Sequence, residues 1–180
     1  MTRVVGVDLS LTSTGLADAD GCTDRMRTKP DKGADALLDN LNRIANITRA
    51  VMDFAAFGED EQQAALVVVE GPAFSRGAMG GQHVRAGLWW TVAAGLTART
   101  MRVLVVPPST RAMYATGRGN AGKDEVLAAA IKRYPHHDIT GNDVADAVIL
   151  AAIGARLLGH PIEDSLPKAN ERAMAKVALP

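Results

Sequence analysis

The sequence predicts an α/β domain built on a mixed β-sheet. Short, apolar, β-branched segments open the chain and recur twice in its middle. Segments with the spacing of amphipathic helices lie between and after them. The resulting order is strands first, then helix, strand, helix, strand and further helices, which is typical of an α/β fold. The 180 residues fit one domain of this class.

The N-terminal part predicts a strand followed by a β-meander. Residues 4–9 are mainly valine and reach Asp8 before a polar stretch, so they predict a buried strand. Residues 11–15 are rich in Thr and Ser and end in glycine, which predicts a turn. Residues 16–21 and 22–28 then predict two further strands.

Two valine-rich segments in the middle of the chain predict the remaining strands. Residues 65–70 form the clearest of them, and residues 103–106 form the other. Proline follows both segments closely and ends them. Because both are apolar without interruption, they predict parallel strands in central positions, with helices covering both faces of the sheet.

Helical spacing predicts five helices around these strands. Apolar residues recur at intervals of three and four in the segments 33–57 and 82–99, and the segments 109–114, 124–134 and 142–158 are predicted as helices as well. Ser109 or Thr110 is the candidate N-cap of the short one. We expect residues 1–160 to form the domain. Residues 161–180 are expected to be a loosely attached tail with a helix over 169–179.

The composition excludes several classes of protein. The hydrophobic fraction of 47% and the charged fraction of 22% argue against disorder. With Cys22 as the single cysteine, the chain has no internal disulfide and no multi-cysteine metal site. Its apolar runs are too short to span a bilayer. The N-terminus runs directly into a strand and lacks the layout of a signal peptide. We therefore expect a cytoplasmic protein without a membrane partner.

The charge is zero overall but unevenly placed. Residues 70–134 hold nine Lys or Arg against three acids, whereas residues 1–69 hold seven against eleven and residues 135–180 four against six. A basic middle between acidic flanks can present a positive face on a neutral molecule. Composition alone favours the simpler interpretation, in which these charges solvate helix surfaces.

Four carboxylates occupy the ends of predicted elements. Asp8 and Glu70 end two strands, and parallel strands bring such ends to one edge of a sheet. Asp143 and Asp146 lie three residues apart near the start of a helix, so they share one face. Oxygen ligands of this kind suit Mg²⁺ or Mn²⁺, and two such ions can hydrolyse a phosphodiester.

Each of these acids also has a simpler interpretation. An Asp or Glu after a strand is often a turn former or the first solvated residue. Asp143 alone is compatible with an ordinary acid in the first turn of a helix. Asp146 differs, because Ala147 to Ile153 continue from it as a strongly apolar helix. A buried carboxylate is costly without a partner, and a metal ion offsets that cost.

The ordered set of motifs resembles RuvC-type Holliday junction resolvases. The matching pieces cover roughly residues 3–158, in the family's order: Val5 to Gly15 around Asp8, Val67 to Glu70, the small-residue loop and helix from Gly77 to Ala94, Val106 to Arg111, Gly117 to Lys123, and Asn142 to Ala147. The compact size, the lack of a strongly basic charge balance and the Trp89-Trp90 pair look more like phage-encoded members than the bacterial housekeeping type. For the tryptophan pair we favour a role in packing.

The resemblance implies an RNase H-like fold with a five-stranded mixed sheet flanked by helices. It implies a homodimer that nicks opposite strands of four-way DNA junctions, using two Mg²⁺ or Mn²⁺ ions per site. Asp8, Glu70, Asp143 and Asp146 would be catalytic and bind the metal, and Lys123 would approach the scissile phosphate. DNA contacts would come from Phe74, Arg76, Arg85, Arg111, Arg118 and Lys123. Phe74 is the candidate junction wedge, although Gly71-Pro72 shifts its position.

Three other functions remain open at this stage. The carboxylates would equally serve an exonuclease or an enzyme that cleaves RNA or RNA–DNA hybrids. Residues 8–15 also resemble the first phosphate motif of actin-like sugar kinases, but those need a second domain that 180 residues do not supply. A non-catalytic DNA-binding module with the same fold is the fourth reading, and the presence of all four carboxylates argues against it.

Overall fold

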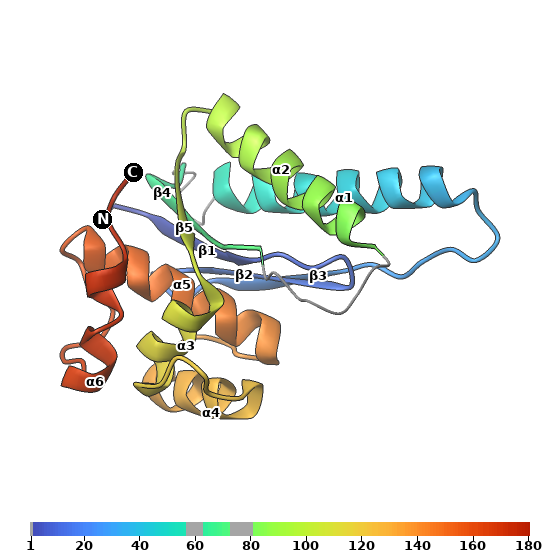
Figure 1. Ribbon diagram of the computed structural model, residues 1–180. Coiled ribbons are helices and arrows are strands. Elements are labelled where there is room, and N and C mark those ends of the chain that lie inside the picture. Colours follow the sequence, from blue (N-terminus) through green and yellow to red (C-terminus); the bar gives the residue numbers. More distant parts are fainter. Residues whose placement is uncertain (1, 57–62, 73–80) are drawn as a thin grey trace.

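The computed structural model describes residues 2–56, 63–72 and 81–180 and contains a five-stranded mixed sheet (Figure 1). The spatial order is β3-β2-β1-β4-β5. The first three strands pair antiparallel, and β1, β4 and β5 pair parallel. The predicted mixed sheet is therefore confirmed, with strands β1 (Val4–Asp8), β2 (Ser13–Asp18), β3 (Thr23–Arg27), β4 (Leu66–Glu70) and β5 (Arg102–Val106).

Helices cover both faces of this sheet (Figure 1). Helices α1 (Ala36–Ala56) and α2 (Gln82–Ala98) lie side by side on one face. Helix α5 (Asn142–Leu157) lies on the other, with α3 (Pro108–Thr116), α4 (Lys123–Arg133), α6 (Lys168–Glu171) and the 3₁₀ turn η1 (Met174–Lys176) around it. Among the described residues, no helix combines the length and the apolarity that crossing a membrane requires.

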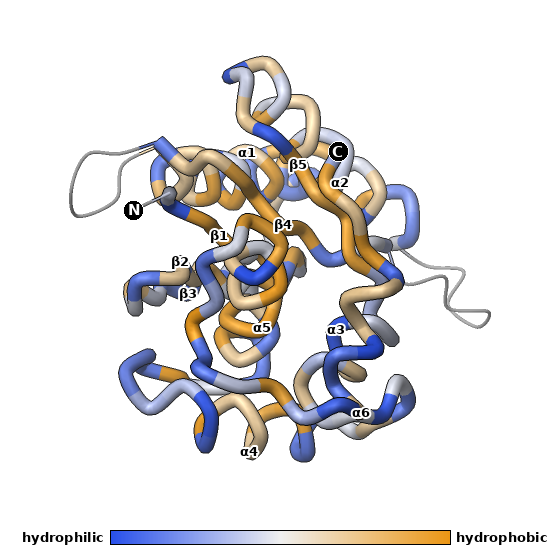
Figure 2. Tube along the Cα trace, turned by 90° about the vertical axis from the view of Figure 1, so that its left-hand side faces the viewer, coloured by the Kyte–Doolittle hydropathy of each residue, from blue (hydrophilic) through white to orange (hydrophobic). Residues whose placement is uncertain are grey.

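The alternation of side chains along the strands gives the sheet two apolar faces. On β1, Val5 and Val7 pack with the core under α1 and α2, whereas Val4 packs with the core around α5. Helix α5 itself is buried from Val144 to Ala155. In Figure 2 the hydrophobic helix α5 lies between the sheet and α4. A helix that is apolar on all sides is expected to be buried in this way.

Three glycines let α5 approach the sheet to backbone contact. A Cβ atom on Gly6 of β1 would lie 2.0 Å from the carbonyl oxygen of Ala147, and one on Gly15 of β2 would lie 2.0 Å from that of Asp143. Further along, a Cβ on Gly154 of α5 would lie 2.6 Å from Val4 Cγ1. Any side chain at these places would push the helix off the sheet. The start of α5 is therefore fixed directly over β1 and β2.

Three local predictions differ from the structure. Residues 13–15, expected in a turn, begin β2, because the hairpin to β1 turns earlier. Strand β5 lies at an edge of the sheet rather than in its centre, with Val105 exposed and Val106 buried. Helix α3 begins at Pro108, and no side chain caps it. Proline in the first turn needs no N–H partner, which explains this start.

The C-terminal segment is packed rather than loosely attached. The helix expected over residues 169–179 is present only as α6 and η1. Asn170 is buried and donates its side-chain N–H to the carbonyl oxygen of Tyr114 on α3, at 2.8 Å. Buried Glu163 accepts hydrogen bonds from the hydroxyls of Tyr114 and Tyr134, at 2.6 and 2.9 Å. These bonds hold α3 between the tail and the core.

We predict that Gly6→Ala destabilises the protein by about 3 kcal/mol or more, because the new methyl group overlaps the backbone of α5. The measurement is urea unfolding followed by circular dichroism. Gly122→Ala is the control, since a Cβ there meets no atom within 4 Å. It should cost about 1 kcal/mol or less, because alanine is a poorer N-cap of α4 than glycine but meets no atom. Equal effects of the two substitutions would contradict the close contact.

Candidate active site

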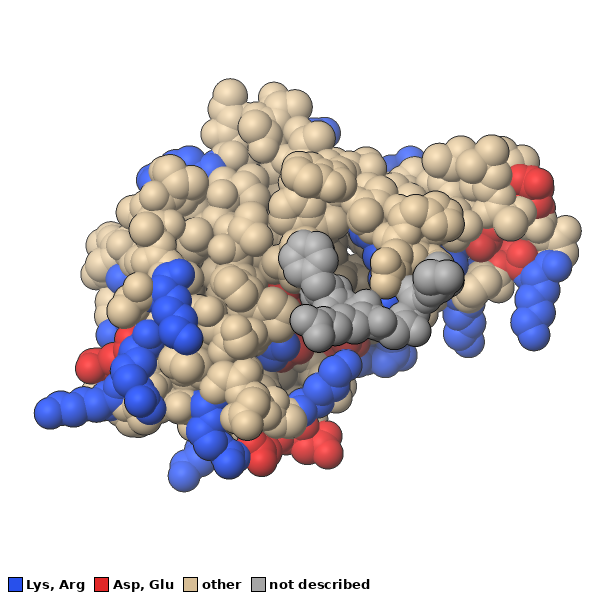
Figure 3. Space-filling model, viewed as in Figure 1, with Lys and Arg blue, Asp and Glu red and all other residues tan. Residues whose placement is uncertain are grey.

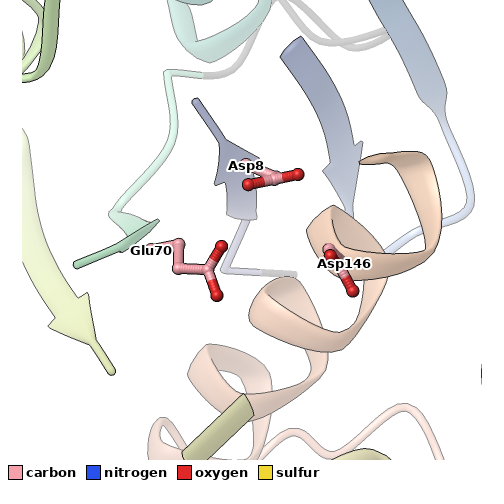
Figure 4. A group of neighbouring side chains, drawn as sticks. All are labelled: Asp8, Glu70 and Asp146. Carbon is pink, nitrogen blue, oxygen red and sulfur yellow. The ribbon is translucent and has the colours of Figure 1, made fainter. Parts of the chain in front are cut away.

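Two neighbouring parallel strands bring the first two carboxylates together. Val7 of β1 lies beside Val69 of β4 in the parallel register, so the next residue on each strand, Asp8 and Glu70, emerges at the same edge. This is the edge where α/β sheets place their sites. Asp146 reaches the same place from α5, whose N-terminal turns pass over β1 and β2 (Figure 4).

The carboxylates of Asp8, Glu70 and Asp146 form one cluster. Each offers an oxygen, and the three oxygens lie within 4.8 Å of one another. Asp8 and Glu70 are half-buried, and Asp146 is buried. Three of the four predicted acids are thus assembled from three separate elements, as expected for a site and not for unrelated turn formers.

The fourth predicted acid, Asp143, stands beside this cluster. Its carboxylate accepts a hydrogen bond from the Ser13 hydroxyl at 2.5 Å. It is not one of the three residues whose oxygens group together. Its charge nevertheless raises the pKa of Asp146, so it faces the same region. Ser13 was not predicted as a site residue, and its place in the Ser- and Thr-rich segment after Asp8 was the available signal.

Arg111 lies inside the cluster. Its Nε donates to Glu70 Oε1 at 2.9 Å, and its Nη1 forms a short ion pair with Asp146 Oδ1. The guanidinium side chain is only 11% exposed. It comes from the first turn of α3, which β5 delivers to the edge of the sheet. A residue expected to contact the DNA backbone is therefore bound to two of the three carboxylates.

Burial and mutual repulsion raise the pKa values of two carboxyls. The pKa of Asp146 is raised to about 7, first because burial disfavours its charge and then because Glu70 and Asp143 repel it. Arg111 and Lys123 act in the opposite direction. The pKa of Asp8 is also raised, mainly by burial and then by Glu70 and Asp146. Such perturbed groups at one place are typical of functional sites.

Trp89 supports Glu70 from the α2 side. Its indole N–H donates to the backbone carbonyl oxygen of Glu70 at 3.0 Å, where β4 ends. Its ring meets Trp90 edge to face, with centroids 4.9 Å apart. Trp89 packs against the core under α1 and α2, whereas Trp90 is 68% exposed. The expected packing role holds for Trp89, while its bond to Glu70 had no sequence signal.

The remaining predicted DNA contacts lie outside the cluster. Lys123 is exposed at the first position of α4, near enough for its charge to lower the pKa of Asp146. Arg118 is exposed and paired with Glu125 at 2.6 Å, and Arg85 is exposed on α2. Phe74 and Arg76 lie outside the described residues. Figure 3 shows acidic atoms in a recess near the middle of one face, with Lys and Arg gathered beside it, over α3, α4 and α6.

The donor set fits a hard divalent cation. All three grouped ligands are carboxylates, which Mg²⁺ and Mn²⁺ prefer over nitrogen or sulfur ligands. A cation would also relieve the repulsion that raises the pKa values of Asp8 and Asp146. The cluster can therefore hold a metal ion. Asp143 lies near enough for its charge to act on Asp146, so it can contribute to binding.

Comparison with solved structures identifies the fold. The chain is similar to Thermus thermophilus RuvC, with a TM-score of 0.61 and 18% identity over 88% of this chain and 97% of that one. It is also similar to T. thermophilus RuvC in complex with a Holliday junction substrate, with a TM-score of 0.63 and 16% identity over 89% and 98% of the two chains. This chain has the RuvC fold. Its sequence matches no protein-family model and no curated protein.

We predict that Asp146→Asn stabilises the metal-free protein at pH 8. The ordinary pKa of 3.8 rises to about 7 on folding, so the folded state binds the proton more tightly and loses stability as pH rises from about 4 to 7. Removing the charge should recover roughly 2–4 kcal/mol at pH 8 and little at pH 4.

Thermal unfolding in EDTA at both pH values measures this difference. Asp53→Asn is the matched control, because Asp53 is an exposed carboxylate on α1. A variant that melts no higher than the wild type at pH 8 would contradict the cost of the buried charge.

Proposed function

We propose that this protein is a metal-dependent endonuclease that resolves four-way DNA junctions. One observation carries the proposal: three carboxylates from β1, β4 and α5 meet at the sheet edge of a chain with the RuvC fold. The similar T. thermophilus RuvC is known in complex with a Holliday junction substrate. The two observations together favour DNA junctions over other phosphate esters.

Asp8, Glu70 and Asp146 would hold the metal, and Asp143 would complete the set for a second Mg²⁺ or Mn²⁺. When bound, such ions lower the pKa of an attacking water and stabilise the oxygen that leaves phosphorus. In the hydrolysis, a P–O bond to water forms, the P–O bond to one sugar oxygen breaks, and that oxygen takes up a proton.

The basic residues around the site suit a phosphate backbone. Lys123 would place its ammonium beside the reacting phosphate, where negative charge develops. Arg85 and Arg118 are exposed, and Arg118 would exchange its surface ion pair with Glu125 for DNA, which is positioned by phosphate contacts rather than base contacts. We also propose Phe74 as the junction wedge and Arg76 as a backbone contact, both outside the described residues.

A homodimer would present two such sites to one junction. Helices α1 and α2, which pack against each other, support this proposal, because Leu37, Leu38 and Leu41 on α1 and Trp90 on α2 expose between 52% and 68% of their area. Exposed large apolar side chains on neighbouring helices are a feature that protein interfaces cover. Burying them between two copies would link the two sites through the same helix layer.

We also propose a phage-encoded enzyme that acts in the host cytoplasm. The compact chain, the neutral overall charge and the Trp89-Trp90 pair are the support for this origin. A cytoplasmic location follows from the proposed substrate, since junctions form where DNA recombines.

The protein should cut a labelled four-way junction in Mg²⁺ and leave linear duplex, single strand and RNA–DNA hybrid intact. Asp146→Asn should lower the rate by at least about a hundredfold while binding the junction as well or better, because it removes a metal ligand and a negative charge near phosphate. Asp53→Asn, on the surface of α1, should cut like the wild type. Gel analysis of both strands gives rate and symmetry.

Two results would revise the proposal. Equal cleavage of several substrates would make the protein a broader nuclease with the same site. Junction binding without any Mg²⁺-dependent cleavage would favour a DNA-binding module.

The double substitution Leu37→Glu and Leu41→Glu should convert a dimer into a monomer in sedimentation velocity at micromolar concentration. The added charges would be buried without partners at the interface. Ile131→Glu is the control, because Ile131 is 50% exposed on α4, on the opposite side of the sheet. A wild type that sediments as a monomer, or a double variant that stays dimeric, would count against this interface.

A further inference from the structure

The guanidinium of Arg111 is the nearest positive charge to the carboxylate cluster in the part of the chain that the structure describes. Two different nitrogens bind two different acids, Nε to Glu70 and Nη1 to Asp146. All three side chains are at most 15% exposed, so water screens the pairs poorly. The contact is therefore much stronger than an exposed ion pair such as that of Arg118 with Glu125.

The backbone of Arg111 is held in place. Its N–H donates to the carbonyl oxygen of Pro107 at 3.1 Å, within the first turn of α3. One turn further along, Tyr114 is fully buried and bonded to Glu163 and Asn170 of the tail. Helix α3 thus cannot carry Arg111 away from the acids, and only the side chain can leave.

A divalent cation would need the same partners. Glu70 and Asp146 are two of the three carboxylates whose oxygens lie within 4.8 Å of one another. A carboxylate oxygen that accepts an N–H has fewer lone pairs for a cation, and a guanidinium beside a divalent ion costs like-charge repulsion at low screening. Arg111 and the cation cannot both bind the cluster at full strength.

We propose that Arg111 is an internal counter-ion that competes with divalent cations for Glu70 and Asp146 and so sets the cation concentration at which the site fills. The proposal rests on the proposed metal-dependent function of this cluster. In the metal-free protein, Arg111 offsets the repulsion among the acids and keeps them together. When cations bind, its side chain gives up at least one of its two carboxylates.

Arg111 would therefore raise the stability of the metal-free protein and lower its affinity for metal. Arg111 lowers the pKa values of Asp8 and Asp146, so it stabilises the charged cluster before metal arrives. Part of the free energy of metal binding is then used to displace it. A variant without this arginine would be less stable when metal-free, but its metal site would fill at a lower cation concentration.

The test is the binding of Mn²⁺, without DNA, to the wild type, Arg111→Gln and Arg49→Gln, counted as free ion by electron paramagnetic resonance at pH 8.5. The high pH limits competition by protons. Arg111→Gln should bind the first Mn²⁺ about tenfold more tightly or better, because the competing charge is gone. Arg49→Gln removes the same charge from the exposed surface of α1 and should bind like the wild type.

Thermal unfolding with and without Mn²⁺ gives the second readout. Arg111→Gln should have a lower melting temperature than the wild type in EDTA, and Mn²⁺ should raise its melting temperature by more. Arg111→Lys, which retains one charge but cannot bridge two acids equally well, should fall between them and serves if the glutamine variant does not fold.

The outcomes separate the two proposals. If the wild type binds Mn²⁺ and the Arg111 variants bind it no more tightly, the counter-ion role is overturned and the metal site remains. No Mn²⁺ binding by any of the proteins overturns both.

Discussion

Backbone contact between α5 and the first two strands sets the geometry of the site. Gly6 and Gly15 carry no side chain where the carbonyl oxygens of Ala147 and Asp143 lie. That contact places the first two turns of α5 over β1 and β2, and with them Asp146 over Asp8. The position of Asp146 therefore depends on β1 and β2 having glycine, with no side chain, at residues 6 and 15.

Bringing the three carboxylates together in a poorly solvated place costs electrostatic free energy. Three carboxylates share a small, half-buried space, and burial together with repulsion raises the pKa of Asp146 to about 7. The protein offsets this cost with Arg111, with the nearby charge of Lys123, and with a firm anchor for Glu70 through Trp89. Local strain of this kind persists in functional sites because the surrounding structure holds it in place.

Much of the fold could be predicted from the sequence, because its elements are locally encoded. Residues 66–70 are a short valine-rich segment stopped by Gly-Pro, which predicts a strand, whereas residues 142–157 are a longer, mostly apolar segment, which predicts a buried helix. Strand β5 was placed in the centre of the sheet, since apolarity does not report which strand ends a sheet. Residues 13–15 were placed in a turn because Thr and Ser are ambiguous between turn and strand.

The site was predictable to the extent that it depends on strand ends. The proximity of Asp8, Glu70 and Asp146 could be predicted because parallel register and helix periodicity place them. The bonds of Arg111, of Trp89 to Glu70 and of Ser13 to Asp143 were not found. They join side chains from elements far apart in sequence, and only the packing of helices on the sheet decides them.

The position of α5 and the tail in the chain has a consequence for synthesis on the ribosome. Asp8 and Glu70 emerge early, but Asp146 follows far behind them, and Glu163 and Asn170, which bond to Tyr114 of α3, come later still. A nascent chain therefore exposes two acids at an unfinished sheet edge and has no complete cluster. The three-carboxylate cluster can be complete only after Asp146 has left the exit tunnel, so a shorter nascent chain lacks the third oxygen of the set.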